Sequence, residues 1–569
     1  MIVGIDLGTT NSLVSAMTVS GPVVLASPEG AQLMPSAVAM DDDGTLLVGA
    51  PALERLTRDP DAGVRWFKRD MGSDRPLVLG DRTWTATELS AMVLRELKVR
   101  AELALGAPVD RAVITVPAYF REPQRAATME AGALAGLEVA RLVNEPTAAA
   151  LAHGLLDSQT ERTVAVLDLG GGTFDITLLE VFDGLIDVRA TGGDARLGGE
   201  DFTDALLQHA VASLALADPD ALGWRRAALR RECEEAKRRV TDGEVCHVPL
   251  PDLASPLWRT LRRLEVTPEV LAQAAEPLVR RLRVCILDTL HAGGLAADAV
   301  DEVLLVGGSS RLTALRDLAA EVFGRDPVAG TDPDLAVALG AAVQAGLVDD
   351  HAAVDDLMVT DVLGHSLGVE VAKSGVDRVH SGYYLPVLHR NTTLPVRRVE
   401  RLSTMHPKQT RITIAVYQGE HRYVANNDKL GQFVVADIPE ASEGGNQAVD
   451  VAFTHDVNGL LEVEATVVST GEVATLVVER REGRLSEAAR ARAVAALARL
   501  KTHPRELLPN KLLLEAALAR HARLDPGQRE LLDGPLLAYE SALERQQPEA
   551  ITESADALRR ALAHPALRP

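Results

Sequence analysis

The pattern of hydrophobic and polar residues predicts an α/β organisation for about the first 345 residues. Apolar segments rich in β-branched residues alternate there with alanine-rich segments of helical period, which is typical of strands alternating with helices. Examples are the predicted strands at 112–116 and 163–168 and the predicted helix at 124–135. This part of the chain is therefore expected to be an α/β domain.

The pattern changes beyond this region. An acidic stretch at 349–356 leads into a short apolar piece, Leu357, Met358 and Val359. From 361 to about 478 the hydrophobic period is mostly two, which predicts the strands of a β-sandwich. The acidic and apolar piece is thus expected to link two domains of different architecture.

The last part of the chain returns to a helical period. From 485 onward Ala, Leu, Arg and Glu recur at helical spacing, with breaks expected at Pro504, Pro509, Pro526 and Pro535. The predicted division is an α/β domain at 1–348, a linker at 349–360, a β-sandwich at 361–483 and a short helical tail at 484–569.

The α/β part carries one phosphate-binding pattern twice. Gly-Ile-Asp-Leu-Gly-Thr-Thr occupies 4–10, and Asp-Leu-Gly-Gly-Gly-Thr occupies 168–173. Taken alone, either copy is typical of an ordinary β-hairpin turn. Two copies can clamp a polyphosphate from both sides with backbone N–H groups and threonine hydroxyls, and Asp6 and Asp168 can hold Mg²⁺ through its waters. The duplication predicts a two-lobed ATPase.

A third glycine-rich element follows the predicted strand that begins at 302. Gly307 and Gly308 would let a base and a ribose lie against the backbone, and Arg311 could stack on the base. A glycine turn that closes a strand–helix unit is the plain structural alternative. As the third member of an ordered series, the element favours nucleotide binding.

Composition narrows the class of protein further. A chain of 569 residues should divide into two to four domains, and no run of eighteen apolar residues predicts a membrane span. The net charge of −22 speaks against nucleic-acid binding. Three cysteines without paired spacing, and a first strand that begins at once after Met1, indicate a cytoplasmic protein with reduced thiols. The excess of Ala and Arg indicates a bacterial gene of high GC content.

Longer strings in the sequence resemble one family from end to end. They are IDLGTTNS at 5–12, VPAYF at 116–120, NEPTAAALAHG at 144–154, DLGGGTFD at 168–175, LGGEDF at 197–202, VGGSSRL at 306–312, DPDLAVALGAAVQA at 332–345 and RNTTLP at 390–395. This set resembles the DnaK-type seventy-kilodalton heat-shock chaperones. FKRDMGS at 67–73, STMHP at 403–407 and the truncated tail resemble the specialised HscC branch of that family.

The resemblance implies an actin-like ATPase domain with a defined set of site residues. Lys68 would reach the γ-phosphate, Glu145 and Asp175 would order the attacking water, and Thr173 would assist hydrolysis. Asp6 and Asp168 would hold Mg²⁺, and the resemblance leaves K⁺ as an additional ion. The implied ATP contacts are Gly8, Thr9, Thr10, Asn11, Gly170, Gly171, Gly172, Thr173, Gly199, Glu234, Lys237, Arg238, Thr241, Gly307, Gly308, Ser309, Arg311 and Asp334.

The resemblance also implies that the β-sandwich binds extended apolar peptides. Val369, Leu402, Ile412 and Ile414 would line the cleft, and Tyr383 and Met405 would take the places of arch residues. A stripe of such residues is otherwise typical of an ordinary sandwich core. Leu402 replaces an aromatic residue and the loop at 372–384 is longer than in the housekeeping member, so the peptide preference is not carried over.

Coupling and partners follow from the same resemblance. Pro117 and Arg125 would relay the nucleotide state, and Leu357, Met358 and Val359 would connect the domains. Arg141 and Asn144 match the surface where a J-domain co-chaperone docks. The short tail predicts fast peptide exchange, and a compact segment at 245–264 leaves dependence on an exchange factor open.

The function expected from the sequence is an ATP-dependent chaperone that binds unfolded or specific client polypeptides and is monomeric. Two alternatives remain at this point. The two-lobed fold also serves small-molecule kinases, although a kinase needs no β-sandwich or linker. A client-restricted regulator of the same fold would carry the same motifs.

Overall fold

The structure is a computed structural model of the whole chain. It describes residues 1–153, 161–182, 185–215, 222–223, 225–241, 243–253, 260–328, 332–349, 351, 358–374, 379–440, 445–455, 461–478, 508–521, 524, 526–545, 548–562 and 564. Leu357 and Pro504, which the sequence singled out, lie outside these residues.

The first lobe is built on a mixed sheet. Its strand order is β11-β10-β1-β2-β3, with β1 parallel to β10 and antiparallel to β2. The strands predicted at 112–116 and the helix at 124–135 are present as β10 and α3. The elements are β1 Ile2–Asp6, β2 Asn11–Thr18, β3 Gly21–Val24, β4 Met34–Pro35, β5 Ala37–Met40, β6 Leu46–Val48, α1 Ala50–Arg58, β7 Gly63–Arg65, η2 Phe67–Asp70, β8 Leu77–Leu79, β9 Arg82–Trp84, α2 Ala86–Leu105, β10 Arg111–Val116, α3 Glu122–Leu134, β11 Glu138–Asn144 and α4 Glu145–Ala152.

The second lobe repeats the plan of the first. Its strand order β17-β12-β13-β14 has the same pattern, because β12 is parallel to β17 and antiparallel to β13. The predicted duplication is therefore confirmed at the level of topology. The elements are β12 Arg162–Leu169, β13 Phe174–Phe182, β14 Leu185–Asp194, α5 Gly199–Ser213, α6 Arg225–Thr241, β15 Cys246–Pro251, β16 Thr260–Val266, α7 Pro268–Ala274, α8 Glu276–Gly293, β17 Glu302–Val306, η6 Gly308–Arg311, α9 Thr313–Phe323 and α10 Ala336–Val348.

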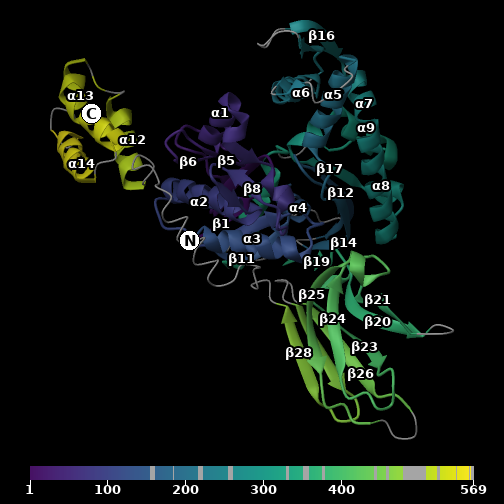
Figure 1. Cartoon of the computed structure of the whole chain (residues 1–569). Coiled ribbons are helices and arrows are strands. Elements are labelled where there is room, and N and C mark those ends of the chain that lie inside the picture. The colour runs from purple at the N-terminus through teal and green to yellow at the C-terminus, as the bar shows by residue number, and fades with distance from the viewer. Residues whose placement is uncertain are drawn as a thin grey trace.

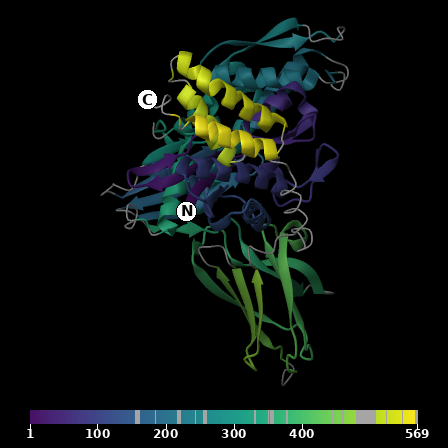
Figure 2. The same cartoon turned by 90° about the vertical axis from the view of Figure 1, so that its left-hand side faces the viewer.

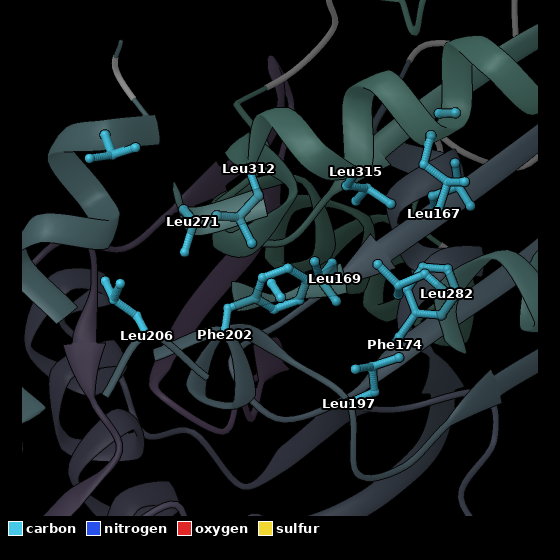
Figure 3. Close-up of a cluster of buried hydrophobic side chains, with 14 of the residues drawn as sticks. Leu167, Leu169, Phe174, Leu197, Phe202, Leu206, Leu271, Leu282, Leu312 and Leu315 are labelled. Atoms are coloured by element: carbon cyan, nitrogen blue, oxygen red, sulfur yellow. The ribbon is translucent and has the colours of Figure 1, made fainter. Parts of the chain in front are cut away.

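Each lobe has its own apolar core. In the second lobe, side chains from the central sheet meet those of the covering helices, as Figure 3 shows for Leu169, Phe174, Phe202, Leu282 and Leu315, all buried. Burial of such side chains contributes roughly 1.5–3 kcal/mol each. This packing fixes the sheet whose ends carry the glycine turns.

Helix α10 packs closely onto the first lobe, because glycines remove side chains at its contacts. A Cβ on Gly4 of β1 would lie 2.3 Å from the backbone carbon of Ala341, and a Cβ on Gly340 would lie 1.6 Å from the carbonyl oxygen of Ala148 in α4. The helix is buried nearly all round, with alanines and valines on every side. It fixes α4, which begins with Glu145, against the first sheet.

The β-sandwich hangs below the ATPase domain (Figure 1) and consists of two four-stranded sheets, β21-β20-β24-β25 and β23-β26-β27-β28. Their inner faces form one core. The predicted loop at 372–384 is mostly strand, since Lys373 pairs with His380 and Val371 with Tyr383. The elements are β18 Met358–Val359, β19 Asp361–Val362, β20 Leu367–Ser374, β21 Val379–Leu388, β22 Thr393–Leu394, β23 Val396–Ser403, β24 Ile412–Gln418, β25 Asp428–Val435, β26 Ala448–His455, β27 Leu461–Val467 and β28 Val473–Val478.

The tail forms a compact helical unit of α12 Leu508–His521, α13 Pro526–Arg545 and α14 Pro548–Leu562. It lies beside the ATPase domain, where α12 contacts α2, and apart from the sandwich (Figures 1 and 2). The break expected at Pro535 is wrong, because α13 continues through it. Buried Leu532, Leu536 and Tyr539 on either side pack into the unit's core and hold the helix despite the lost hydrogen bond.

Among the described residues, no helix is both long and apolar enough to cross a lipid bilayer.

The contact between α10 and α4 makes a stability prediction. Gly340→Ala should destabilise the ATPase domain by at least about 1–3 kcal/mol, because the new methyl group overlaps backbone atoms that cannot move independently. Urea unfolding followed by circular dichroism measures the shift. Gly534→Ala in α13 is the control, since a Cβ there meets no atom within 4 Å and should be neutral or stabilising. Equal midpoints for Gly340→Ala and the wild type would contradict the close packing.

Candidate functional site

The two phosphate-binding turns meet at the bottom of the cleft between the lobes. Gly8 N donates to Ser12 Oγ at 3.1 Å in the turn between β1 and β2, and Gly170 N donates to the Thr173 carbonyl at 3.0 Å in the turn between β12 and β13. A Cβ on Gly171 would lie 2.0 Å from Thr10 Oγ1. The two turns therefore face each other in contact, as the duplication predicted.

Between the turns lies a cavity of about 370 Å³. Nearly every residue proposed for ATP binding or catalysis lines it. The exceptions are Gly172 and Asp175, which lie just behind its wall. The lining residues proposed from the sequence are Asp6, Gly8, Thr9, Thr10, Asn11, Lys68, Glu145, Asp168, Gly170, Gly171, Thr173, Gly199, Glu234, Lys237, Arg238, Thr241, Gly307, Gly308, Ser309, Arg311 and Asp334.

The phosphate end of the cavity concentrates negative charge around one ammonium group. Lys68 Nζ donates to Glu145 Oε1 at 2.6 Å, and both side chains are buried. Burial, with the charge of Glu145, raises the pKa of Asp6 to about 7, although Lys68 and a hydrogen bond from Thr115 oppose the rise. Burial and the neighbouring carboxylates also raise the pKa of Asp168 well above its ordinary value. The electrostatics of this end of the cavity therefore favour the binding of cations.

Asp175 stands behind this group of carboxylates. Its Oδ1 accepts a hydrogen bond from the backbone N–H of Tyr119 at 2.9 Å, in the loop between β10 and α3, where Tyr119 also contacts His365 of the second domain. Burial, with the charge of Glu145, raises its pKa to about 7. Asp175 thus connects the chemistry of the cavity to the segment that contacts the second domain.

The carboxylates fit a hydrated Mg²⁺ rather than an ion held directly by side chains. Within the described part of the chain, no three His, Cys, Asp or Glu side chains converge as a direct metal cage. Mg²⁺ in nucleotide sites usually keeps several waters and takes ligands from phosphates. Asp6 and Asp168 would therefore hold the ion through its water shell.

The end of the cavity that the sequence predicts for adenosine is formed by α6 and the third glycine turn. Lys237 Nζ donates to the Gly199 carbonyl at 2.8 Å and pairs with Glu234 at 2.7 Å. Burial alone would raise the pKa of Glu234, but the charge of Lys237 and hydrogen bonds from Lys237, Thr203 and Arg238 lower it to about 2. Arg311 pairs with Asp334 at 2.8 Å, so its guanidinium lies at the edge of the cavity.

Some residues of the cavity were missed by the sequence reasoning. They include Glu200, which accepts a hydrogen bond from Thr10 and pairs with Arg230 at 2.8 Å. Its signal was present in the LGGEDF string, which carries an acid directly after two glycines at a helix start. The apolar members Leu13, Leu33, Leu312, Pro333 and Val337 were missed as well, although Leu312 ends the VGGSSRL string and Pro333 and Val337 lie in the string at 332–345.

The sandwich contains a gap in one of its sheets. The described ladder between β20 and β24 ends at the pair Val369–Val416, whereas β20 continues to Ser374 beside β21 and β24 starts at Ile412 beside β25. Beyond Val369 the two strands therefore lack each other as partners, which leaves backbone groups for an added extended segment.

The residues predicted for the peptide cleft differ in their surroundings. Val369 and Ile414 are buried in the sandwich core, and Leu402 and Ile412 pack partly buried against it. Met405 is 39% exposed. Tyr383 packs on Tyr423, with ring centroids 5.4 Å apart.

The sandwich is joined to the ATPase domain by the linker strand and by a buried polar network. Strand β18 adds in parallel to β14, with Met358 opposite Leu185 and Val359 opposite Ile186. Arg125 Nη2 donates to Asn144 Oδ1 at 2.5 Å, and Asn144 Nδ2 donates to both carboxylate oxygens of Asp361 at 2.9 Å. The sandwich therefore contacts the residue that directly precedes Glu145.

Further contacts surround this network. Arg121 pairs with Asp428 at 3.0 Å, and the Glu122 N–H donates to Gln418 Oε1 at 2.7 Å. Pro117 accepts a hydrogen bond from the Phe120 N–H in the same loop. Asn144 is only 3% exposed, so in this conformation it serves the contact between the domains and is not open to a docking protein. Arg141 lies half-buried on β11.

A two-lobed cleft with facing phosphate turns, joined through its catalytic wall to a β-sandwich, defines an ATPase coupled to a second binding domain. The chain matches the model of the family described as Hsp70 protein over residues 2–78 and 76–533. It is 39% identical over 494 residues to chaperone protein DnaK of Thermotoga neapolitana, covering 85% of this chain and 81% of the relative. The chain belongs to the Hsp70 family and is an ATP-dependent molecular chaperone that hydrolyses ATP.

His365 provides a pH prediction for the contact between the domains. Its ring lies 4.3 Å from the ring of Tyr119, Nε2 lies 3.1 Å from the Tyr119 carbonyl oxygen, and the side chain is buried. Burial lowers its pKa to about 4. The hydrogen bond to Tyr119 and the charge of Glu420 oppose this, while Arg121 and Arg125 add to it.

Because the docked form holds His365 neutral, docking is fully favourable above the free pKa of about 6.5 and weakens as pH falls below it. The docking equilibrium should fall by up to about tenfold per pH unit in that range. Energy transfer between dyes on the two domains, followed from pH 7.5 to 5.5 with ATP, measures this. His365→Leu should flatten the profile; an unchanged slope in that variant would refute the assignment.

Proposed function

We propose that nucleotide chemistry in the cleft controls whether the β-sandwich holds an extended apolar peptide. The observation that carries the proposal is the direct succession of Asn144 and Glu145. Asn144 binds the first strand of the sandwich through Asp361, and Glu145 binds Lys68 at the phosphate end of the cavity. A change at the γ-phosphate can thus reach the second domain within one residue of chain.

Different residues of the cavity have different roles in hydrolysis. Lys68 supplies a fixed positive charge beside the transferring phosphoryl group, and Thr173 adds a hydroxyl donor. Glu145, with Asp175 behind it, orders the attacking water. Bound Mg²⁺, held through water by Asp6 and Asp168, would neutralise phosphate charge. Four carboxylates against one ammonium also leave room for a monovalent cation such as K⁺.

The proposed peptide site is the gap between β20 and β24. An extended peptide would use the unpaired backbone edge for hydrogen bonds and place an apolar side chain against Val369, Leu402, Ile412 and Ile414. Met405 and Tyr383 would border it. The 39% exposure of Met405 suits a contact that a peptide could cover.

Coupling would run through the linker and the polar network. With β18 added to β14 and Asn144 holding Asp361, the sandwich is docked on the ATPase domain while the helical tail lies against the first lobe. In this arrangement the tail does not cover the sandwich, so peptide should exchange freely. Release of the linker strand would let the sandwich separate and close on its peptide.

Partners are proposed on the same basis. A J-domain co-chaperone and client polypeptides fit a DnaK-like chaperone. The half-buried Arg141, but not the buried Asn144, would be accessible to a J-domain in this conformation. Membership of the HscC branch, a monomeric state, a cytoplasmic location and the need for an exchange factor stay predictions. The small-molecule kinase alternative is not favoured for a member of the Hsp70 family.

The first test concerns hydrolysis. Lys68→Ala should retain ATP binding and lose single-turnover hydrolysis by roughly a hundredfold or more, as for removal of one electrostatic stabiliser of the transition state. Lys98→Ala is a matched control, because Lys98 is half-buried on α2, is not among the residues that line the cavity, and donates to the Gly136 carbonyl at 2.8 Å. Loss of ATP affinity without a selective loss of turnover would rule out the catalytic role.

The second test concerns coupling. ATP should weaken peptide affinity relative to ADP by roughly 5–150-fold, because each ligand must prefer a different global state. Polar replacement of Met358 and Val359, together with Leu357, should abolish this difference while ATP hydrolysis persists. Fluorescence anisotropy of a labelled apolar peptide measures it. Val473→Ser on the exposed part of β28 is the control. Equal wild-type affinities with ATP and ADP would overturn the proposal.

A further inference from the structure

Trp66 takes no part in the site described above, yet its backbone and side chain are held in an unusual state. It lies between β7 and η2, two residues before Lys68, with φ of 61° in the left-handed region. A bulky residue adopts this conformation only where its surroundings hold it. Its indole Nε1 is buried and has no hydrogen-bond partner among the residues that the structure describes. The contacts that hold this side chain are therefore those of its ring face, and not a hydrogen bond from the indole N–H.

That ring face meets the opposite lobe. The guanidinium carbon of Arg230 lies 4.4 Å from the indole centroid, and that of Arg65 lies 4.8 Å from it. Arg65 belongs to the first lobe with Trp66, whereas Arg230 belongs to α6 of the second lobe. The Trp66–Arg230 contact therefore crosses the cleft.

Arg230 shares the helix face that serves the nucleotide. Arg230, Glu234, Lys237 and Thr241 follow the spacing i, i+4, i+7 and i+11, which lies on one side of a helix. The last three line the cavity. The cation–π contact thus lies one helical turn beyond the adenosine site, toward the mouth of the cleft.

The guanidinium of Arg230 is also tied to the phosphate end. It pairs with Glu200 at 2.8 Å and with Asp204 at 2.7 Å, and Glu200 accepts a hydrogen bond from Thr10 of the first phosphate turn at 3.5 Å. A continuous path of contacts therefore runs from Thr10 of the first lobe through Glu200 and Arg230 of the second lobe back to Trp66 of the first.

Two neighbouring contacts cross at the same level. Arg231 donates to the Thr57 carbonyl of α1 at 2.6 Å, and Arg69 pairs with Asp201 of α5 at 2.5 Å. These contacts all join the outer part of the first lobe to α5 and α6. Opening the lobes must break them together.

We propose that Trp66 and Arg230 form a clasp that closes the cleft over bound nucleotide and limits the rate of ADP release. Nucleotide can leave only when α6 separates from the first lobe, and this separation exposes the indole face and parts it from the guanidinium. A partly desolvated cation–π contact of this kind corresponds to roughly a two- to thirtyfold change in the opening equilibrium. Trp66 is a positioning residue and touches no reacting group.

The test is stopped-flow release of a fluorescent ADP analogue from the full chain with Mg²⁺, chased with excess ADP. Trp66→Ala should release the analogue roughly two- to thirtyfold faster, and Trp66→Phe should restore most of the slow rate because it keeps an aromatic face. Single-turnover hydrolysis should change little in both variants. Arg239→Ala is the matched control on the same helix, since Arg239 pairs with Glu244 within the second lobe.

A wild-type release rate in folded Trp66→Ala would overturn the clasp. Unchanged release with impaired hydrolysis would overturn it as well, because Trp66 would then act only by placing Lys68. If Trp66→Ala fails to fold, Arg230→Gln gives the same decision, with faster release expected. If Trp66→Ala folds, its double variant with Arg230→Gln should release the analogue no faster than the faster of the two single variants; full additivity would show that the two residues act separately.

Discussion

The hydrogen bonds between the Asn144 amide and the Asp361 carboxylate connect the two halves of this molecule. A partly buried carboxylate needs hydrogen-bond donors, and both oxygens of Asp361 accept from the Asn144 amide at 2.9 Å. Arg125 holds the other end of that amide, and the next residue along the chain is Glu145. Docking of the sandwich therefore depends on how the end of β11 is placed, and the placement of β11 depends on the cleft.

The charge of the cleft makes this arrangement responsive to nucleotide. Burial raises the pKa of Asp6 and of Asp175 to about 7. The ammonium group of Lys68 lies near these carboxyl groups and pairs with Glu145. Mg²⁺ and a polyphosphate would bring both charge signs into this group and redistribute the pairing of Lys68. Helix α4 packs directly on α10, where Gly340 lies against the Ala148 carbonyl. Because interiors are close-packed, we expect a change in the pairing of Lys68 and Glu145 to displace α4.

The lining of the cavity could be predicted from the sequence almost completely, because most of its residues belong to short strings at strand ends. Either glycine turn alone, at Gly8 or at Gly170, is typical of an ordinary hairpin, and it was their duplication that indicated a shared site between two lobes. The residues that were missed act by shape or across the lobes. Trp66 and Arg230 come from segments far apart in sequence, and the clasp that we propose for them has no local pattern, whereas Glu200 has a signal in the LGGEDF string.

The sandwich and tail were less predictable. Period-two alternation predicted the strands, but it could not show that the ladder between β20 and β24 ends at Val369, because that depends on the path of two strands in space. The break expected at Pro535 followed local propensity, and tertiary packing of Leu532 and Tyr539 overrode it. The burial of Asn144 in the contact between the two domains likewise has no signal in the residues beside it in the sequence.

Hydrogen exchange of the linker strand tests the central claim most directly. In the docked form the Thr360 N–H donates to the Ile186 carbonyl at 3.0 Å, next to the pairing of β18 with β14. The account predicts that amides at 358–362 are protected when the protein is saturated with ATP under conditions of slow hydrolysis, and exchange rapidly with ADP. Equal protection with the two nucleotides would contradict the claim that the cleft controls docking of the sandwich.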